Sequence, residues 1–196
     1  MKGLLLIIFC YLLGSIPFSY LVPKLFSNLD IRKYGSGNVG ATNVLRTIGW
    51  PAALMAVTGD VLKGVIAAWL AVYLGGGIYI LLCPLVAVLG HCYTVFLDFK
   101  GGKGVATSAG VLAVLAPKLL LVLFLVFVLV IVLTRFVSLG SILAATAAPF
   151  LTVYLYPTEL YLVFLIIILA FMIIYKHKAN IDRLRKGTEP KIGEGK

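Results

Sequence analysis

The stretch from Val105 to Thr134, VATSAGVLAVLAPKLLLVLFLVFVLVIVLT, has 30 residues and one charge, at Lys118. As a single helix it would be about 45 Å long, well beyond the ~30 Å hydrocarbon core of a bilayer. The Pro117-Lys118 pair therefore predicts two helices joined by a tight turn, over 105–116 and 119–134. From Gly104 the first helix covers only about 20 Å, so its N-terminus is expected to lie below the membrane surface, like a broken helix of a transporter.

The rest of the chain has the same character. Of its 196 residues, 62% are hydrophobic and 12% are charged, and the mean hydropathy is +1.10. This composition excludes a soluble globular protein and predicts an all-α membrane protein. We expect one domain over residues 1–196, with about seven transmembrane helices, a short broken helix and cytoplasmic glycine-rich loops. The predicted segments are 3–26, 51–75, 78–97, 105–116, 119–134, 137–156 and 159–175.

Basic residues predict the orientation of these helices. All Lys and Arg residues except Lys2 and Lys118 lie on one side of the predicted bundle or within spans near it. By the positive-inside rule that side is cytoplasmic, which places the N-terminus outside and the C-terminus in the cytoplasm. The net charge of +10 then follows from topology, and the scattered cations do not indicate a nucleic-acid partner.

The first unusual loop is KYGSGNVGATN, residues 33–43, which contains G-x-G-x-x-G at Gly35, Gly37 and Gly40. A dinucleotide site would need a strand before the loop and an acidic residue ending a second strand. Here the charged DIRKY precedes it and Asp60 lies in an apolar segment, so that reading fails. Closely spaced glycines still allow successive N–H groups to face one anion. Four side chains can add neutral donors: Ser36, Asn38, Thr42 and Asn43.

The second loop is KGGKG, residues 100–104, and it leads directly into the short helix that begins VAT. Lys100, Lys103, the loop amides and the positive end of a helix converge there, which favours an anion. The spacing is not that of a Walker A loop. The alternative is an ordinary loop with snorkelling lysines.

The third segment is HKANIDRLRKGTEPK, residues 177–191, at the end of the last apolar span. His177, Asn180 and Arg183 recur at helical spacing on a helix that we expect to continue from that span. An imidazole, an amide and a guanidinium on one face suit a phosphate ester that carries hydroxyls. Taken alone, a solvated basic tail would explain the segment equally.

Several titratable groups lie inside the predicted spans. Asp60 and Lys63 are three residues apart and share a helix face, as either a functional pair or a self-neutralising structural one. His91 is expected to be a core histidine. The three cysteines, Cys10, Cys83 and Cys92, are expected to be core residues, since they fit neither a disulfide framework nor a metal motif. The spacing of His, Asp and Glu predicts no metal site and no cofactor.

Three motifs together resemble those of the bacterial acyl-phosphate-dependent glycerol-3-phosphate acyltransferases, the PlsY family. They are SGNVGATN at 36–43, KGGKG at 100–104 with the following VAT, and HKANIDRLRKGTE at 177–189. The resemblance covers nearly the whole chain. It implies a multi-pass protein of the cell inner membrane that transfers a fatty acyl group from acyl phosphate to the 1-hydroxyl of glycerol 3-phosphate, giving lysophosphatidic acid.

The resemblance also implies which residues bind the two phosphates, and the division of these residues between the two substrates is our own inference. The donor phosphate would be held by Ser36, Asn38, Gly40, Thr42, Lys100, Gly102, Lys103 and Gly104. Glycerol 3-phosphate would be held by Arg46, His177, Asn180 and Arg183. Asn43 and Thr107 lie in the same motifs and complete the predicted substrate-binding set. The acyl chain would lie among the spans.

His177, Ser36 and Lys103 are the candidate catalytic residues. Ser36 would need an oriented base to act as a nucleophile, and no carboxylate is obviously placed to orient His177. Acyl phosphate already carries a good leaving group. We therefore expect direct attack by the glycerol 3-phosphate hydroxyl, with the proton taken by His177 or by a phosphate oxygen of the substrate.

A transporter of a phosphorylated small anion is the alternative function, because broken helices and an intramembrane Asp60/Lys63 pair are typical of such proteins. Against it, the polar motifs crowd one membrane face and the sequence has no pair of matching halves. A purely structural subunit would leave two glycine-lysine loops unexplained. The sequence leaves oligomeric state and acyl-chain preference open.

Overall fold

A computed structural model describes residues 2–193, and every regular element in that range is helical. The predicted all-α fold is therefore confirmed. The α-helices are α1 (Lys2–Ser15), α2 (Phe18–Ser27), α3 (Ala41–Thr47), α4 (Trp50–Leu70), α5 (Tyr79–Cys92), α6 (Val105–Leu115), α7 (Pro117–Thr134), α8 (Val137–Leu155), α9 (Leu160–Lys176) and α10 (Lys178–Arg185). Short helical turns cover Ile31–Lys33, Ala71–Gly75 and Val95–Leu97.

Five segments are long and apolar enough to cross a membrane, and a sixth is added if α9 and α10 count as one bent span. The five are Gly3–Ser27, Trp50–Leu74, Tyr79–Leu97, Pro117–Thr134 and Val137–Leu155. Helix α6 is apolar but has only 11 residues. A total of seven spans needs both α6 and α9 to be counted, so that number stays a prediction.

Prolines set two of the helix breaks. The predicted turn before Lys118 is confirmed, since α6 ends at Leu115 and α7 begins with Pro117, a favourable first helical residue. The first apolar segment, predicted as one run over 3–26, is also broken, between Ser15 and Phe18. Pro17 lies in this gap and has no N–H to continue the helical hydrogen bonds of α1.

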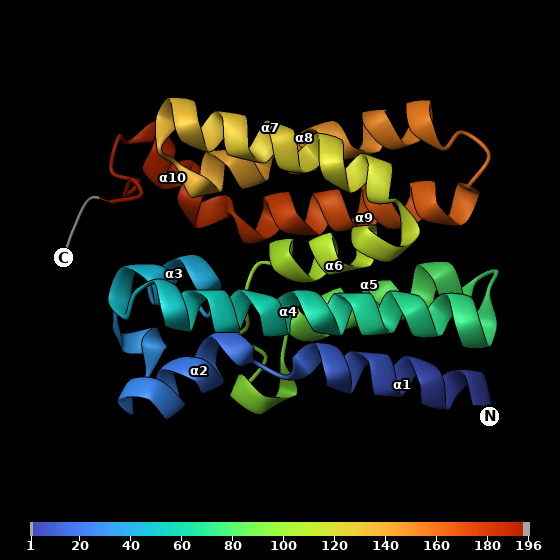
Figure 1. Ribbon diagram of the computed structural model, residues 1–196, viewed down its shortest axis with the longest axis horizontal. Coiled ribbons are helices and arrows are strands. Elements are labelled where there is room, and N and C mark those ends of the chain that lie inside the picture. Colours follow the sequence, from blue (N-terminus) through green and yellow to red (C-terminus); the bar gives the residue numbers. More distant parts are fainter. Residues whose placement is uncertain (1, 194–196) are drawn as a thin grey trace.

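The last apolar helix does not continue straight into the third motif, so that part of the sequence prediction was wrong. Helices α9 and α10 meet at an angle of 54° at His177. Helix α9 is apolar, whereas α10 has the polar sequence KANIDRLR. The bend lays α10 over the end of the bundle (Figure 1). There Asn180 of α10 accepts a hydrogen bond from Lys103 of the second motif.

The helices form two layers with α6 between them (Figure 1). One layer contains α7 to α10 and the other contains α1 to α5. Helix α6 packs on α4 through two glycines, because a Cβ at Gly64 would overlap the carbonyl of Thr107 and one at Gly110 would overlap that of Val61. Small residues of this kind let membrane helices approach closely. Helix α6 begins part-way along the bundle, as its length predicted (Figure 1).

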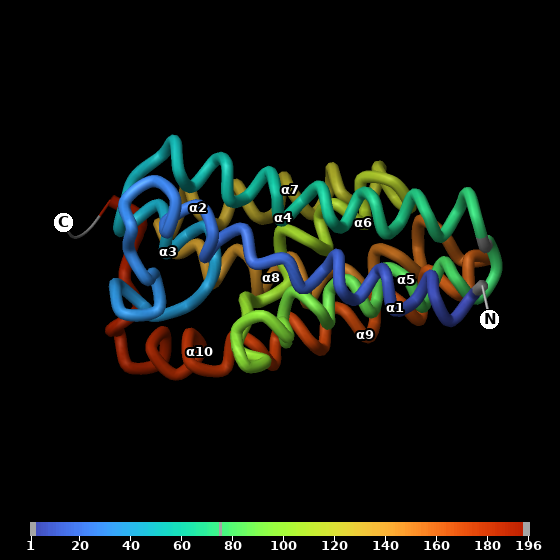
Figure 2. Tube along the Cα trace, turned by 90° about the horizontal axis from the view of Figure 1, so that it is seen from below, coloured from blue at the N-terminus to red at the C-terminus, as the bar shows by residue number. Residues whose placement is uncertain are grey.

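The three motifs meet at one end of the molecule. Helices α3 and α10 lie at this end, and α1 starts at the opposite end (Figure 2). The predicted core cysteines, Cys10, Cys83 and Cys92, are buried and unbridged. Residues 33–43, 100–104 and 177–191 thus come together in the fold.

Candidate active site

A cavity of about 420 Å³ lies between the two layers and joins a polar mouth to an apolar interior. The mouth is lined by Ser36, Asn38, Thr42, Asn43, Arg46, Lys103, Ser138, Ser141, His177, Asn180 and Glu189. The interior is lined by Leu112, Leu120, Leu123, Phe124, Phe127, Ala144, Ala145, Ala148, Ile166, Leu169, Ala170 and Ile173. Its volume is within the ~300–1,000 Å³ usual for small-ligand sites. Such a cavity suits a molecule with a polar head and an apolar tail.

The glycine loop at the mouth is held in shape by Asn43. The side-chain oxygen of Asn43 accepts a hydrogen bond from the Ser36 N–H at 2.9 Å. Its amide nitrogen donates to the carbonyls of Ile31, Tyr34 and Asn38 at 3.2, 3.0 and 3.1 Å. Asn43 was predicted to donate to a substrate, but its amide hydrogens are occupied by the loop itself. Its observed role is to position the loop.

Two glycines make this loop path possible. Gly35 and Gly37 have φ angles of 57° and 68°, in the left-handed region that residues with a Cβ rarely adopt. Ser36 and Asn38 follow these glycines and line the cavity, together with Gly40 and Thr42. The loop thus turns its predicted donors toward the mouth.

The second loop is fastened to the end of α5. The Gly101 N–H donates to the Cys92 carbonyl at 3.2 Å, and the Gly102 N–H donates to the His91 carbonyl at 3.0 Å. Gly104 has a φ of 86° and turns the chain into α6. Lys103 and Gly104 line the cavity, and the first turn of α6 faces the same space.

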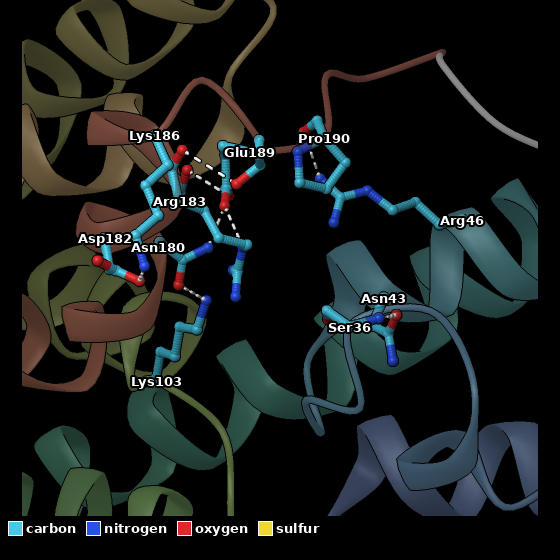
Figure 3. Close-up of polar contacts among 12 residues, drawn as sticks. Ser36, Asn43, Arg46, Lys103, Asn180, Asp182, Arg183, Lys186, Glu189 and Pro190 are labelled. Carbon is cyan, nitrogen blue, oxygen red and sulfur yellow. Dashed lines mark hydrogen bonds and ion pairs between the residues drawn. The ribbon is translucent and has the colours of Figure 1, made fainter.

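A chain of hydrogen bonds links Lys103 to the third motif (Figure 3). The Lys103 ammonium donates to the Asn180 side-chain oxygen at 2.5 Å, and the Asn180 amide donates to Glu189 Oε1 at 2.6 Å. Ser138 on α8 donates to the same oxygen at 2.7 Å. Arg183 donates through Nε to Glu189 Oε2 at 2.7 Å. Glu189 therefore binds residues from α8 and α10 around the mouth.

The electrostatics of this network are dominated by positive charge. Burial lowers the pKa of Lys103 to about 8, and the neighbouring Arg183 and Arg46 lower it further while Glu189 opposes them. Burial alone would raise the pKa of Glu189, but hydrogen bonds from Ser138, Asn180 and Arg183 outweigh burial and lower it. Glu189 is thus ionised, and Lys103 lies among cations that favour an incoming phosphate.

Arg46 on α3 contributes a third cation to the mouth. Its Nη2 donates to the Pro190 carbonyl at 3.0 Å, which ties α3 to the segment after α10 (Figure 3). Within the described part of the chain, its buried Nε has no hydrogen-bond partner, and neither have the buried hydroxyls of Thr107 and Ser108. Buried donors are nearly always paired in folded proteins. Of these, Arg46 and Ser108 line the cavity, so their unpaired donors are available to a ligand.

His177 lies at the bend after the apolar helix α9. Its Nδ1 is 2.8 Å from the Ile173 carbonyl, so Nδ1 carries the hydrogen and Nε2 has a free lone pair. Burial, reinforced by the Lys103 ammonium, lowers the pKa of the ring to about 4. The imidazole is therefore neutral at physiological pH.

The cavity brings together most of the predicted site residues. Those that line it are Ser36, Asn38, Gly40, Thr42, Asn43, Arg46, Lys103, Gly104, His177 and Asn180. Four others lie outside the lining: Lys100, Gly102, Thr107 and Arg183. Lys100 is exposed, whereas Gly102 and Thr107 are buried. Arg183 pairs with Glu189.

Sequence reasoning missed other residues of the site. Glu189 lies inside the third motif, and an acidic residue among so many cations was the available signal. Ser138, Ser141 and Ser108 line the cavity from α8 and α6, and no sequence pattern marked them. His91 was expected to be a core histidine, yet it also lines the cavity and lies beside Asp60.

Comparison with known proteins identifies relatives over nearly the whole chain. The family model described as glycerol-3-phosphate acyltransferase matches residues 4–187. The glycerol-3-phosphate acyltransferase of Syntrophomonas wolfei is 48% identical over 192 residues, which cover 98% of each chain. That of Bacillus subtilis is 45% identical over 188 residues, covering 96% of each chain.

Two solved structures are also similar to this chain. They are crystal structures of PlsY, an integral membrane glycerol 3-phosphate acyltransferase, in a glycerol 3-phosphate form and a lysophosphatidic acid form. Both are 42% identical to this chain, and each alignment covers 98% of it and 96% of the other chain. The TM-scores are 0.93 and 0.91.

Proposed function

This chain belongs to the glycerol-3-phosphate acyltransferase family and acts in phospholipid synthesis, and we propose that its acyl donor is acyl phosphate. The acyl group passes to the 1-hydroxyl of glycerol 3-phosphate, giving lysophosphatidic acid and inorganic phosphate. The alternative of an anion transporter is not supported, since the relatives reported above are acyltransferases.

The observation that carries the donor assignment is the presence of two anion-binding segments at one cavity mouth. One segment is the glycine loop 35–43, and the other is the Lys103 loop with the start of α6. Both offer hydrogen-bond donors to a negatively charged group. Glycerol 3-phosphate supplies one phosphate. A second phosphate bonded to the acyl carbon would use the other segment and place the acyl chain in the apolar interior. A thioester donor has no phosphate at its reacting carbon.

We assign the donor phosphate to the glycine loop and the start of α6. Ser36, Asn38 and Thr42 would donate from one side and Lys103 from the other, with the helix dipole of α6 adding positive potential. Glycerol 3-phosphate would bind across the mouth, with its phosphate on Arg46 and its hydroxyls near Asn180 and His177. Gly102, Thr107 and Arg183 would then act by shaping this site from behind its lining.

Direct transfer is the mechanism that this arrangement favours. The 1-hydroxyl oxygen attacks the acyl carbon, the bond from that carbon to the phosphate oxygen breaks, and inorganic phosphate leaves. An imidazole with a pKa of about 4, as for His177, is a weaker base than a phosphate monoester, whose second pKa is about 6. We therefore assign the proton to a phosphate oxygen of glycerol 3-phosphate. His177 orients the hydroxyl, and Ser36 donates a hydrogen bond to the donor phosphate.

Reconstitution tests the donor. The purified protein in liposomes is given glycerol 3-phosphate with either acyl phosphate or acyl coenzyme A, and lysophosphatidic acid is measured. We expect lysophosphatidic acid to form when acyl phosphate is the donor and not when acyl coenzyme A is the donor. Product from acyl coenzyme A at an equal or higher rate would refute the assignment.

A pair of lysine variants tests the phosphate loop. Lys103→Ala is expected to lose nearly all turnover, because it removes a partly buried cation from the donor phosphate. Lys118→Ala, at the far end of α7 from the mouth, is the matched control and should keep wild-type turnover. Equal activity of Lys103→Ala and wild type at subsaturating donor would remove Lys103 from the site.

Intact-mass measurement tests the direct mechanism. The protein is incubated with acyl phosphate alone, quenched and weighed, and we expect no acyl adduct. A stoichiometric adduct that maps to Ser36 and disappears on addition of glycerol 3-phosphate would establish a covalent route instead.

A further inference from the structure

We propose that Asp60 and His91 form a positioning pair that holds the Lys100–Gly104 loop in place for the donor phosphate. Asp60 lies in the middle of α4 and His91 near the end of α5. Both are buried and both line the cavity. The inference rests on the proposed phosphate-binding role of this loop.

The Asp60 carboxylate is surrounded by three partners. Ser19 Oγ donates to Oδ2 at 2.8 Å. Lys63 Nζ is 2.8 Å from Oδ1, which confirms the ion pair predicted from their spacing. His91 Nδ1 is 3.4 Å from the same oxygen, an electrostatic contact, since Oδ1 has no hydrogen-bond partner among the described residues. A cluster of this kind inside a membrane segment is costly and often marks function.

Lys63 has a structural explanation of its own. Its ammonium also donates to the Ile16 carbonyl at 2.9 Å, in the break between α1 and α2. Lys63 therefore balances the charge of Asp60 and adds a second hydrogen bond to the Ile16 carbonyl, which also accepts the Phe18 N–H at 3.2 Å. This contact does not explain why a histidine lies against the same carboxylate.

His91 holds the loop in two ways. Its backbone carbonyl accepts the Gly102 N–H at 3.0 Å. Its ring lies against Gly102, since a Cβ at that residue would overlap His91 Nε2 and come within 2.7 Å of the Val39 carbonyl. Gly102 is thus fitted between the His91 ring and the first glycine loop. The orientation of the ring therefore limits the space beside Gly102 and the adjacent Lys103.

Asp60 determines how the ring is held. The negative charge of the Asp60 carboxylate, which can only accept hydrogen bonds, favours the tautomer in which Nδ1, the ring nitrogen 3.4 Å from Oδ1, carries the hydrogen. That contact directs the Nε2 edge toward Gly102. The path of contacts then runs from Asp60 through His91 and Gly102 to Lys103, which donates to Asn180. Asp60 acts on the donor site through His91 and does not contact the reacting atoms.

Steady-state kinetics of three variants test this pair: Asp60→Asn, His91→Gln and the double variant. Supporting groups of this type typically change affinity or activity by about 10–100-fold. We expect each single variant to raise the KM for acyl phosphate by about that factor, with a smaller change in kcat. Because Asp60 acts through His91, the double variant should have the KM of His91→Gln alone.

Thr152→Val is the matched control. Thr152 is equally buried, on α8, and its hydroxyl bonds only within its own helix. The variant should keep the wild-type KM. Melting temperatures in detergent are measured for every variant, because a merely structural role would lower stability and leave the KM of the folded fraction unchanged.

Several outcomes would overturn the proposal. A wild-type KM in Asp60→Asn, or single effects that multiply in the double variant, would show that Asp60 does not act through His91. If Asp60→Asn does not fold, Ser19→Ala replaces it, which removes only the hydrogen bond to Oδ2. We expect this variant to raise the KM about three- to tenfold, and an unchanged KM would then overturn the pair.

Lys103→Ala, measured alongside, separates this inference from the proposed function. A raised KM in Lys103→Ala with no effect of Asp60→Asn would reject the positioning pair and keep the phosphate loop. An unchanged KM in Lys103→Ala would reject the phosphate loop itself.

Discussion

The apolar end of the cavity predicts how long an acyl chain the enzyme accepts. Four lining residues are the furthest along their helices from the polar mouth: Leu112 on α6, Leu120 on α7, Ala148 on α8 and Ile166 on α9. Beyond them lies a buried apolar cluster that includes Ala116, Leu119 and Leu162. These four side chains therefore form the floor of the cavity. Ala148 is the smallest of them, and a larger residue there would raise the floor.

The effect of Ala148→Leu can be estimated from this geometry. Ten residues of α8 separate Ser138 at the mouth from Ala148 at the floor, which is a depth of about 15 Å. Leucine adds three carbons at the floor and displaces about as many methylenes of a chain that reaches it. At about 0.8 kcal/mol per methylene the loss is about 2.4 kcal/mol, or about 60-fold in kcat/KM. Chains that end short of the floor should be unaffected.

The assay is kcat/KM for a series of saturated acyl phosphates that differ by two carbons. In Ala148→Leu we expect the optimum to move to shorter chains. Ala147→Leu is the control, because the same substitution one residue earlier lies outside the cavity lining and should leave the profile unchanged. An equal loss for every chain length in Ala148→Leu, or an unchanged profile, would refute the assignment of the floor.

Three further predictions concern charge, stability and topology. The pKa of Lys103 is lowered to about 8, so the ammonium is lost as pH rises through that value and kcat/KM for acyl phosphate should fall there. Lys103→Arg stays charged, and its pH profile should lack that fall; the same fall in both proteins would contradict the assignment. Glu189→Gln should lower the free energy of unfolding by about 2–4 kcal/mol, because it weakens buried hydrogen bonds from Asn180 and Arg183. Asp182→Asn, which breaks only an exposed pair, should change that free energy by less than about 0.5 kcal/mol, and equal unfolding midpoints for both variants would contradict this. Reporter fusions should place the N-terminus outside and the C-terminus in the cytoplasm, and finding both on one side would exclude an odd number of spans.

The sequence was most informative where one residue type has one physical meaning. Pro117 predicted the end of α6 correctly because proline cannot continue a helix from the preceding turn. The apolar runs predicted the helices because a bilayer requires them to be long and uninterrupted. The all-α fold and the meeting of three motifs at one end could therefore be expected before any coordinates.

The sequence was least informative about contacts between distant residues. Ser138 and Glu189 are 51 residues apart and share a buried hydrogen bond, which no local pattern encodes. The bend at His177 also depends on these contacts, since α10 must turn across the bundle to reach them. Asn43 was expected to face a ligand because amides bind phosphates well. The Asn43 amide instead donates to carbonyls of the same loop, which lie within hydrogen-bonding distance. The φ angles of Gly35 and Gly37 shape the loop that brings these carbonyls there.

The contacts that Glu189 and Pro190 make at the mouth have a consequence for biosynthesis. Ribosomes make these residues after every apolar helix of the bundle, so Lys103, Ser138 and Arg46 enter the membrane before their partners exist. A nascent chain that has been made only as far as Lys176 has the residues of the apolar cavity interior and the Lys100–Gly104 loop but lacks Asn180, which accepts a hydrogen bond from Lys103. We therefore expect acyl transfer to begin only after translation has passed the third motif, and a chain that ends before Asn180 to be inactive.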